Sequence, residues 1–485
     1  MRWSLLMAAA MLSVSAPALA GPWIEPGDVQ VREDVERLKA ARIINGPTNA
    51  WPLPWAVMSD LARAADDAQL PPDLRAAAQR LQRVAELADQ PNGGEATVTY
   101  TDRPALIRDF GAGAREDFDG ELRVTQQLGN LYISLGGGYR RHQLGNDWHL
   151  DQTYAAYKLG NWAVYGGFVE HWWGPGNSGS LLFSTSARPF PKIGFKRLAA
   201  HPIDFPVLRW LGPWRFDMFV GDLGNRRDFD NAKVIAMRFD FAPAPGLEIG
   251  LNRALQLCGD NRPCGFNTIG KALTGFGNAD NTGTPNEPGN QIAGFDLSYT
   301  TRIGPVTARL YGEMEAEDED NIIIDKFARM AGAKFSGPLG GGGASWELGG
   351  EWTDTYAWEL TTGDRKPGIV YRNFIYFDGF TYRDQPIGNS VDTDSELLSF
   401  DAAVTDTANR RYYGSFRKAK LNITARADHR LSANPENISI GTLGVMVPTQ
   451  FGDLRLEGRY MNDLPGTPGR SPNAIDFEAS WRTRF

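Results

Sequence analysis

From about residue 97 to the C-terminus, apolar and polar residues alternate along many short segments. In VTARLYGEME (306–315), for example, Leu310 lies on one face while Arg309 and Glu313 lie on the other. Alternation with a period of two places the two sets on opposite faces of a β-strand. A soluble sandwich shows the same period, but the number and length of these segments and the charge on their polar faces favour an outer-membrane barrel.

Eighteen such segments can be placed, which is an even number, as single-chain bacterial barrels have. Short turns such as 128–130 and 159–161 alternate with long polar connections such as 172–187 and 355–394. This alternation is typical of short periplasmic turns and long extracellular loops. The C-terminal segment ends in Phe485, a usual end for such barrels. The predicted strands are 97–108, 119–128, 131–141, 149–159, 162–171, 190–198, 214–223, 233–242, 247–257, 290–300, 306–315, 326–335, 345–354, 395–404, 411–426, 437–448, 453–461 and 476–485.

The N-terminal part of the chain has a different pattern. Residues 1–20 combine an early arginine, a short apolar stretch and an Ala-Leu-Ala end, which predicts a secretory signal peptide. Residues 21–94 place apolar side chains at helical spacing, as in DVQVREDVERLKAARI and PPDLRAAAQRLQRVAELADQ. We therefore expect a small periplasmic α-helical domain at 21–94, followed by an all-β transmembrane barrel of about 18 antiparallel strands at 95–485.

The net charge bears on which partners the protein can have, and the cysteine content on whether it has a disulfide. The formal net charge is −8, which argues against nucleic acid as a partner. The chain has two cysteines, Cys258 and Cys264, in CGDNRPC. In an oxidising compartment a disulfide across this loop is expected, and two free thiols are the alternative. We expect no metal and no cofactor.

The polar faces of the predicted strands point into the lumen and carry charges of both signs. Mixed charges favour a structural network of ion pairs, because a selective pore tends towards rings of one sign. A conducting lining is the alternative. The residues assigned to this network are Arg309, Glu313, Glu315, Glu347, Glu351, Lys418, Lys420, Arg426, Arg455, Glu457 and Arg459.

The stretch EHWWGPGNSGS (170–180) follows a predicted strand that starts from a short turn, so we expect it at the extracellular rim. Trp172 and Trp173 then have two interpretations. They can belong to the aromatic girdle at the headgroup level, or they can stack on sugar rings. Neighbouring residues on a strand point in opposite directions, so at most one of the two faces lipid. A hydrolase is a weaker interpretation, because GNSGS is not a G-x-S-x-G elbow.

The segment HWWGPGNSGSLLFSTSARPFPKIGFKR (171–197) resembles the capsule assembly Wzi family of outer-membrane proteins, which carries a WWGPG…GSL…S..ARP.P motif. The resemblance extends to NEPGNQIAGFDLSY (286–299), YGEMEAEDE (311–319), EWTDTY (351–356) and IYFDGFTYRDQPIGNSVDTDS (375–395), and to the helical segment 27–55. One departure is Asn389, where the family pattern leads us to expect histidine. The resemblance implies a barrel with a periplasmic helical bundle that acts as a lectin, not an enzyme.

The resemblance further implies that the protein helps to retain or organise capsular polysaccharide or exopolysaccharide at the cell surface. Expected partners are this polysaccharide, outer-membrane lipid and other capsule export or assembly proteins. Tryptophan and tyrosine rings stack on sugars, and arginine binds carboxylates through two hydrogen bonds. A porin or solute channel is the alternative function. The candidate polysaccharide-binding residues are Trp172, Trp173, Asn177, Arg188, Arg372, Tyr376, Tyr382 and Arg383.

Overall fold

The computed structural model describes residues 21–58, 61–88, 92–111, 113–142, 145–274, 289–317, 325–464 and 473–485. The expected signal peptide, 1–20, lies outside the described residues, as do parts of the expected long connections 258–289, 316–325 and 462–475. Within the described ranges, no helix has both the length and the apolar character needed to cross a membrane.

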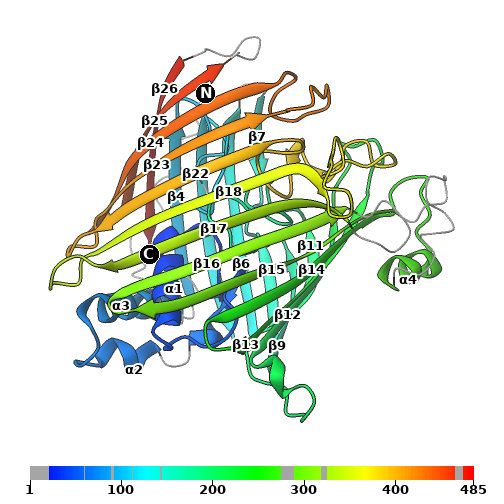
Figure 1. Ribbon diagram of the computed structural model, residues 1–485. Coiled ribbons are helices and arrows are strands. Elements are labelled where there is room, and N and C mark those ends of the chain that lie inside the picture. Colours follow the sequence, from blue (N-terminus) through cyan, green and yellow to red (C-terminus); the bar gives the residue numbers. More distant parts are fainter. Residues whose placement is uncertain are drawn as a thin grey trace, which may run out of the picture.

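A closed antiparallel β-barrel forms most of the molecule (Figure 1). Its last strand, β26 (Asn473–Arg484), pairs with its first, β4 (Asn92–Thr101), and this pairing closes the cylinder. β7 (Gly145–His149) and β8 (Tyr154–Leu159) share one position, because both pair with β6 (Leu131–His142). The described residues therefore form eighteen strand positions, which confirms the predicted number.

The other barrel strands follow one another around the wall in chain order, and β19 (Arg365–Lys366) is a short addition paired with the end of β18. They are β5 (Phe118–Leu128), β9 (Trp162–Gly167), β11 (Lys192–Arg197), β12 (Trp214–Asp222), β13 (Lys233–Ala244), β14 (Leu247–Leu257), β15 (Gly289–Ile303), β16 (Val306–Glu317), β17 (Lys326–Pro338), β18 (Ser345–Glu359), β22 (Glu396–Thr405), β23 (Arg411–Leu421), β24 (Glu436–Thr449) and β25 (Gly452–Leu464).

Most predicted strand bounds agree with the structure to within a few residues, but two need correction. The first strand was predicted at 97–108, but β4 ends at Thr101 and begins at Asn92, inside the region assigned to the helical domain. β23 ends at Leu421, whereas a strand was predicted to continue to residue 426. The chain turns there because the Asn422 side chain donates to the Arg426 and Ser432 carbonyls and accepts from the Arg426 N–H.

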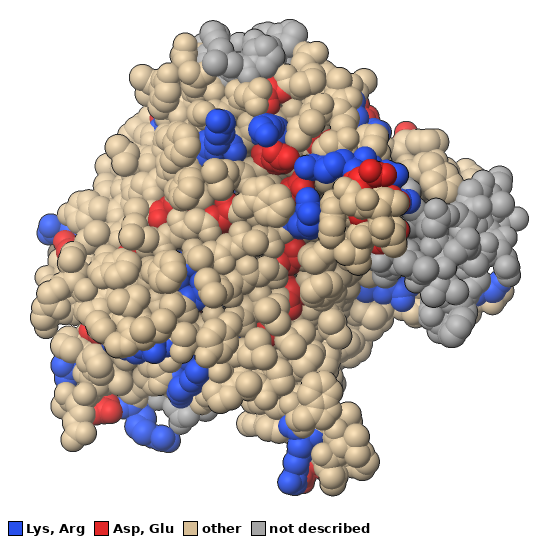
Figure 2. Space-filling view, viewed as in Figure 1, with Lys and Arg blue, Asp and Glu red and all other residues tan. Residues whose placement is uncertain are grey.

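Side chains on the barrel wall alternate as predicted, with apolar residues outside and polar residues inside. On β16, Leu310 is 55% exposed on the outer surface, while Glu313 on the lumenal side is 1% exposed. In a membrane the outer face meets lipid, which needs no hydrogen bonds from the protein. In Figure 2 charged side chains gather towards the loops at the end opposite the helices, and much of the wall is uncharged.

The expected lumenal network is largely present. Arg309 binds Glu36 at 2.9 Å, and Arg459 binds Glu457 at 2.9 Å. The assignment of Lys418, Lys420 and Arg426 to this network is wrong. Both lysines are exposed on the outer face, and Arg426 lies in the connection after β23, where it binds Asp428 at 2.9 Å. The pattern LNITARAD placed them on the inner face, but the chain turns at Asn422, and the inward positions of β23 are instead the odd-numbered residues that include the buried Arg417.

The N-terminal segment folds into helices at the short-turn end of the barrel (Figure 1). α1 (Val29–Ala40) lies within the barrel end and packs against α3 (Pro72–Ala88), which also packs against α2 (Leu61–Asp66). These helices confirm the predicted helical periodicity. Short elements complete the segment: β1 (Trp23–Ile24), β2 (Ala50–Trp51), β3 (Leu53–Pro54) and the 3-10 helix η1 (Trp55–Met58).

The charged face of α1 is buried against the charged barrel interior. Glu36 meets Lys334 of β17 at 3.2 Å in addition to Arg309, and Glu33 pairs with Arg411 of β23. Burial raises the pKa of Glu36, but Arg309 and Lys334 outweigh it, and the net pKa falls to about 2. The helix is therefore fixed by ion pairs to one part of the barrel wall, from β16 to β23.

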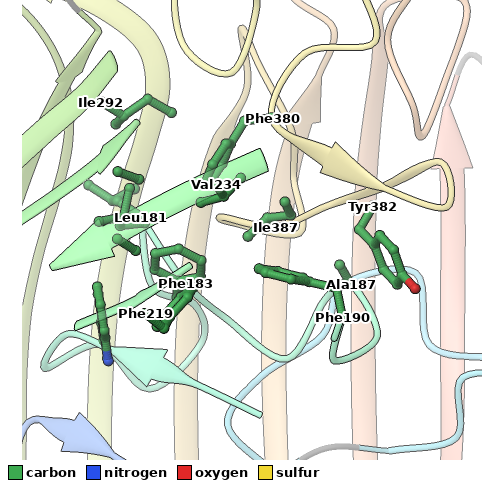
Figure 3. Packing of buried hydrophobic residues seen from close by; sticks show 14 of the residues in the cluster. Leu181, Phe183, Ala187, Phe190, Phe219, Val234, Ile292, Phe380, Tyr382 and Ile387 are labelled. Atoms are coloured by element: carbon green, nitrogen blue, oxygen red, sulfur yellow. The ribbon is translucent and has the colours of Figure 1, made fainter. Parts of the chain in front are cut away.

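Loops that return into the barrel form its largest apolar core (Figure 3). Phe183, from the connection after β9, packs against Phe219 of β12 with ring centroids 5.4 Å apart. Phe380 and Ile387, from the connection after β19, belong to the same cluster. Two short hairpin strands, β20 (Thr381–Tyr382) and β21 (Gln385–Pro386), shape that second connection. The two longest described connections thus fill part of the lumen.

Candidate functional site

The WWGPG stretch lies inside the barrel, and its predicted position at the extracellular rim is wrong. Trp172 and Trp173 form the short strand β10, which pairs with β2 of the N-terminal segment. Both indoles are 0% exposed. A stacking platform for sugars needs an accessible ring face, so neither tryptophan can serve as one in this structure.

The turn after the two tryptophans is held by carboxylates from the barrel wall. Glu351 of β18 accepts hydrogen bonds from the Asn177 and Ser178 N–H groups at 2.6 and 3.1 Å, and Glu313 of β16 accepts one from the Leu181 N–H at 2.9 Å. Gly174 has φ +145°, and a Cβ there would lie 2.6 Å from a Glu313 carboxylate oxygen. The glycine allows the backbone to approach the wall, and the two glutamates satisfy buried N–H groups.

Three of the predicted site residues, Arg188, Tyr382 and Arg383, come together at the long-loop end. Arg188 follows β9 in the first returning connection, and Tyr382 and Arg383 lie in the β20–β21 hairpin. Both guanidinium groups bind one carboxylate, Asp147 of β7: Arg188 at 3.3 Å and Arg383 at 3.0 Å. The Arg383 guanidinium lies 5.7 Å from the Tyr382 ring centroid. We call Arg188, Tyr382, Arg383 and Asp147 the arginine patch.

The arginine patch keeps positive charge, and its accessible surface belongs to Arg383 and Asp147, whereas the Tyr382 ring is 6% exposed and cannot serve as a stacking platform. The Arg383 side chain is 39% exposed and that of Asp147 is 43% exposed. Arg188 is less exposed and also binds Glu116 at 2.6 Å. The exposed Arg226 is close enough to act electrostatically on Asp147. A single partly exposed carboxylate thus faces several guanidinium groups, an arrangement that suits an additional carboxylate or phosphate from outside.

The remaining predicted residues have structural roles in the described chain. Arg372 is 4% exposed and binds Asp392 through both terminal nitrogens. Tyr376 is 1% exposed, and its hydroxyl donates to the Cys258 carbonyl at 2.8 Å. Asn177 is half-buried beside the lumenal cavity described below. Arg372 and Tyr376 are therefore corrected from binding candidates to residues that hold loops together.

The predicted disulfide between Cys258 and Cys264 is present, with Cα atoms 4.7 Å apart. It opens the connection that carries α4 (Phe266–Thr274). The Cys258 carbonyl that binds Tyr376 lies at the base of this connection, so the disulfide-bonded loop is joined to the returning loop at 365–395.

A cavity of about 270 Å³ lies in the lumen along the wall formed by β4–β6 and β22–β26. It is lined by arginines and carboxylates that include Arg108, Arg140, Asp401 and Glu457. Because the lining carries both signs, no single-charge ring surrounds the space. The cavity is lined by residues of the lumenal ion-pair network. The arginine patch residues do not line it.

One group of side chains among the described residues has the spacing of metal ligands: Asp119, Glu121 and His149, with donor atoms within 4.8 Å of one another. Arg140 binds Asp119 at 2.5 Å and Glu121 at 2.9 Å. The guanidinium thus already provides the positive charge that the two carboxylates require. The group is an ion-pair cluster on the lumenal wall.

Sequence reasoning missed Asp147 and Glu116, which position the arginines of the patch. Asp147 lies in the strand segment β7, and no motif marks it. An indirect signal is the excess of arginine in the long connections, at 188, 226, 227, 383 and 430, because such residues need carboxylate partners to be ordered.

Comparison with known proteins agrees with this architecture. A family described as capsule assembly protein Wzi matches residues 87–462. An uncharacterized 55.8 kDa protein in the cps region of Klebsiella pneumoniae is 28% identical over 459 residues, which cover 93% of this chain and 87% of that protein. The solved structure of Wzi from Escherichia coli, described as a carbohydrate-binding β-barrel involved in group 1 capsule assembly, superimposes with a TM-score of 0.78 at 22% identity and covers 96% of this chain and 99% of that one. The Pseudomonas aeruginosa protein OccK3 aligns with a TM-score of 0.43 at 11% identity, over 81% of this chain and 95% of that one.

Proposed function

Because the chain belongs to the capsule assembly protein Wzi family, we propose that it is an outer-membrane lectin that binds surface polysaccharide and helps to retain or organise it. The barrel provides a rigid support in the outer membrane, and its loops carry the binding groups. The Escherichia coli protein with the same fold is described as carbohydrate-binding, which supports the proposal. The polysaccharide is a capsule or an exopolysaccharide.

The observation that carries the proposal is the arginine patch. Arg383 and Arg188 share Asp147, and the exposed part of Arg383 leaves guanidinium N–H groups available to a ligand. Planar guanidinium groups bind carboxylates through paired hydrogen bonds, and uronic acids or pyruvate groups carry carboxylates along a polymer. An extended polymer adds many such weak contacts, so modest affinity at one site is enough for retention.

We propose that the helices and the C-terminus face the periplasm. The turns at their end of the barrel are short, whereas the connections at the other end are long, and this asymmetry is typical of outer-membrane barrels. The arginine patch then faces outward, where surface polysaccharide is anchored. The N-terminal helices are the part of the protein available to other capsule export or assembly proteins.

The proposed activity is binding without catalysis. His171, which precedes the two tryptophans, is 3% exposed, and burial lowers its pKa to about 3. Its Nε2 lies 3.3 Å from the Tyr165 hydroxyl. The imidazole is enclosed by aromatic rings of Trp173 and Phe219, so a substrate cannot reach it as a base.

Direct binding of the purified full-length protein to several surface polysaccharides, acidic and neutral, tests the proposal. The wild-type protein should bind an acidic polymer, and the double variant Arg188→Ala/Arg383→Ala should bind it at least about tenfold more weakly, as expected for loss of two charge-assisted contacts. Arg209→Ala is the matched control, because Arg209 is an exposed, ion-paired arginine at the opposite end. Absence of binding to every polymer by the wild-type protein would exclude the lectin function.

A further inference from the structure

The connection between β11 and β12, residues 198–213, lies at the short-turn end of the barrel and carries an unusually apolar tip. It projects beyond the barrel wall near β9 and β13, at the same end as α2 and α3 (Figure 1). Four large apolar side chains are exposed there: Phe205 at 54%, Val207 at 69%, Leu208 at 37% and Trp210 at 62%. A turn that is surrounded by water gains nothing from large apolar side chains. Exposed apolar clusters of this kind mark sites of contact with a membrane or with another protein.

The tip is continuous with the lipid-facing surface of the barrel. Trp210 packs edge-on against Phe241, with ring centroids 6.0 Å apart. Phe241 lies on the outer face of β13, where Phe239 and Trp214 of β12 extend the same aromatic band. Aromatic bands on the outer face of a barrel lie at the membrane interface. Because the tip contacts this band, it lies beside the lipid headgroups and not under the barrel lumen.

The base of the connection is held by Arg197, whereas the backbone groups of its tip form hydrogen bonds with one another. Arg197 donates to the His201 and Trp214 carbonyls at 3.2 and 2.6 Å and stacks on the Trp214 ring at 3.8 Å. At the tip, the N–H groups of Leu208 and Arg209 both donate to the Phe205 carbonyl. The 3-10 turn η2 (Arg209–Leu211) continues this pattern with a bond from the Leu211 N–H to the Leu208 carbonyl. Local pairing of backbone groups is what a segment needs in order to enter a medium poor in water.

We propose that residues 203–211 form an interfacial anchor that inserts Phe205, Val207, Leu208 and Trp210 into the phospholipid leaflet at the short-turn end. This leaflet is the periplasmic one under the orientation proposed above, but contact with lipid does not depend on that orientation. Asp204 and Arg209, paired at 2.7 Å and both largely exposed, remain at the headgroup level. The anchor fixes the depth of the barrel on the side where β11 and β12 are short.

Depth-dependent fluorescence quenching tests the anchor. A Val207→Cys variant of the full-length protein, labelled with an environment-sensitive dye, is reconstituted into vesicles of phosphatidylethanolamine and phosphatidylglycerol with or without lipids that carry a quencher on the acyl chain. The control is Asn130→Cys, in the exposed β5–β6 turn at the same end. The two native cysteines are joined in a disulfide and do not react with the label.

The label at residue 207 should be quenched several-fold more strongly than the label at residue 130. Addition of Phe205→Ser and Trp210→Ser should reduce quenching at residue 207 to the control level, without loss of the folded barrel as judged by its migration on unheated gels. Equal quenching at both positions would overturn the proposal. That outcome would instead mean that the tip stays in water, where a periplasmic protein could cover it.

Discussion

Trp172 and Trp173 are adjacent in the sequence, yet they belong to two different apolar cores. Trp172 packs against Phe110, with ring centroids 5.2 Å apart, in the core that includes the N-terminal helices. Trp173 packs against Phe183 at 4.9 Å in the core formed by the returning loops. Because neighbouring strand residues point in opposite directions, the pair joins the N-terminal segment to the lumenal loops.

Replacement of Trp173 by alanine should destabilise the protein by about 3–5 kcal/mol, since it removes a fully buried indole and leaves a cavity. The measurement is the midpoint of thermal unfolding of the purified protein in detergent. Trp148→Ala is the matched control, because Trp148 is 77% exposed on the outer face and should cost less than about 1 kcal/mol. Similar stability of the two variants would mean that Trp173 does not connect the loops to the barrel.

The lumen should not conduct ions in steady, large openings. α1 is held inside it by buried ion pairs to the wall, among them Glu36 with Arg309 and Lys334. Single-channel recording in planar bilayers checks this. Glu36→Gln removes the carboxylate that Arg309 binds and leaves Lys334 with Glu347 alone, so it should produce brief openings that the wild-type protein lacks. Steady large openings by the wild-type protein would favour the porin interpretation instead.

Acidification should loosen the turn at residues 429–432. The His429 Nδ1 accepts hydrogen bonds from the Leu431 and Ser432 N–H groups at 3.2 and 3.3 Å, which requires an unprotonated Nδ1. Burial lowers the pKa of His429 below its usual 6.5. The positive charge of Arg372 lowers this pKa further, whereas the negative charge of Asp392 raises it. The unfolded turn therefore takes up a proton first, and stability is complete above pH 6.5 and is lost as the pH falls below that value.

Hydrogen–deuterium exchange at the Leu431 and Ser432 amides, corrected for intrinsic exchange, measures this effect. Protection should decrease between pH 7.5 and pH 5.5 in the wild-type protein. His429→Gln should show no such dependence, because its amide does not titrate in this range. Equal protection of the wild-type amides at both pH values would contradict the assigned protonation state.

The fold could be predicted from the sequence because the polarity of each wall residue depends mainly on which face of its strand the residue occupies. β16 illustrates this: the alternation in 306–315 gives both its bounds to within two residues and the direction of Leu310 and Glu313. The amphipathic spacing of α1 is equally local. The alternation gave the wrong face where it was extended across a turn. The turn at Asn422 interrupts the pattern, so Lys418 and Lys420 were assigned to the inner face although they lie on the outer one.

The site was harder to predict, because long connections can either extend outward or return into the lumen. The direction of the WWGPG stretch is decided by Glu313 and Glu351, which lie more than 130 residues further along the chain. Arg188 and Arg383 are also joined by a residue from elsewhere, Asp147. The resemblance to the capsule assembly Wzi family implied that arginines and aromatic rings of the loops bind a glycan, but the tertiary contacts decide which of them remain accessible.

The central claim is that the protein retains surface polysaccharide through its long-loop end. The most direct measurement compares cell-bound with shed polysaccharide in a strain that lacks the gene and is complemented with wild-type protein, Arg188→Ala/Arg383→Ala or Arg209→Ala, each at equal levels in the outer membrane. Wild-type protein and Arg209→Ala should restore the cell-bound fraction, and the double variant should leave most of the polymer in the medium. An unchanged ratio of cell-bound to shed polymer on deletion of the gene would contradict the account.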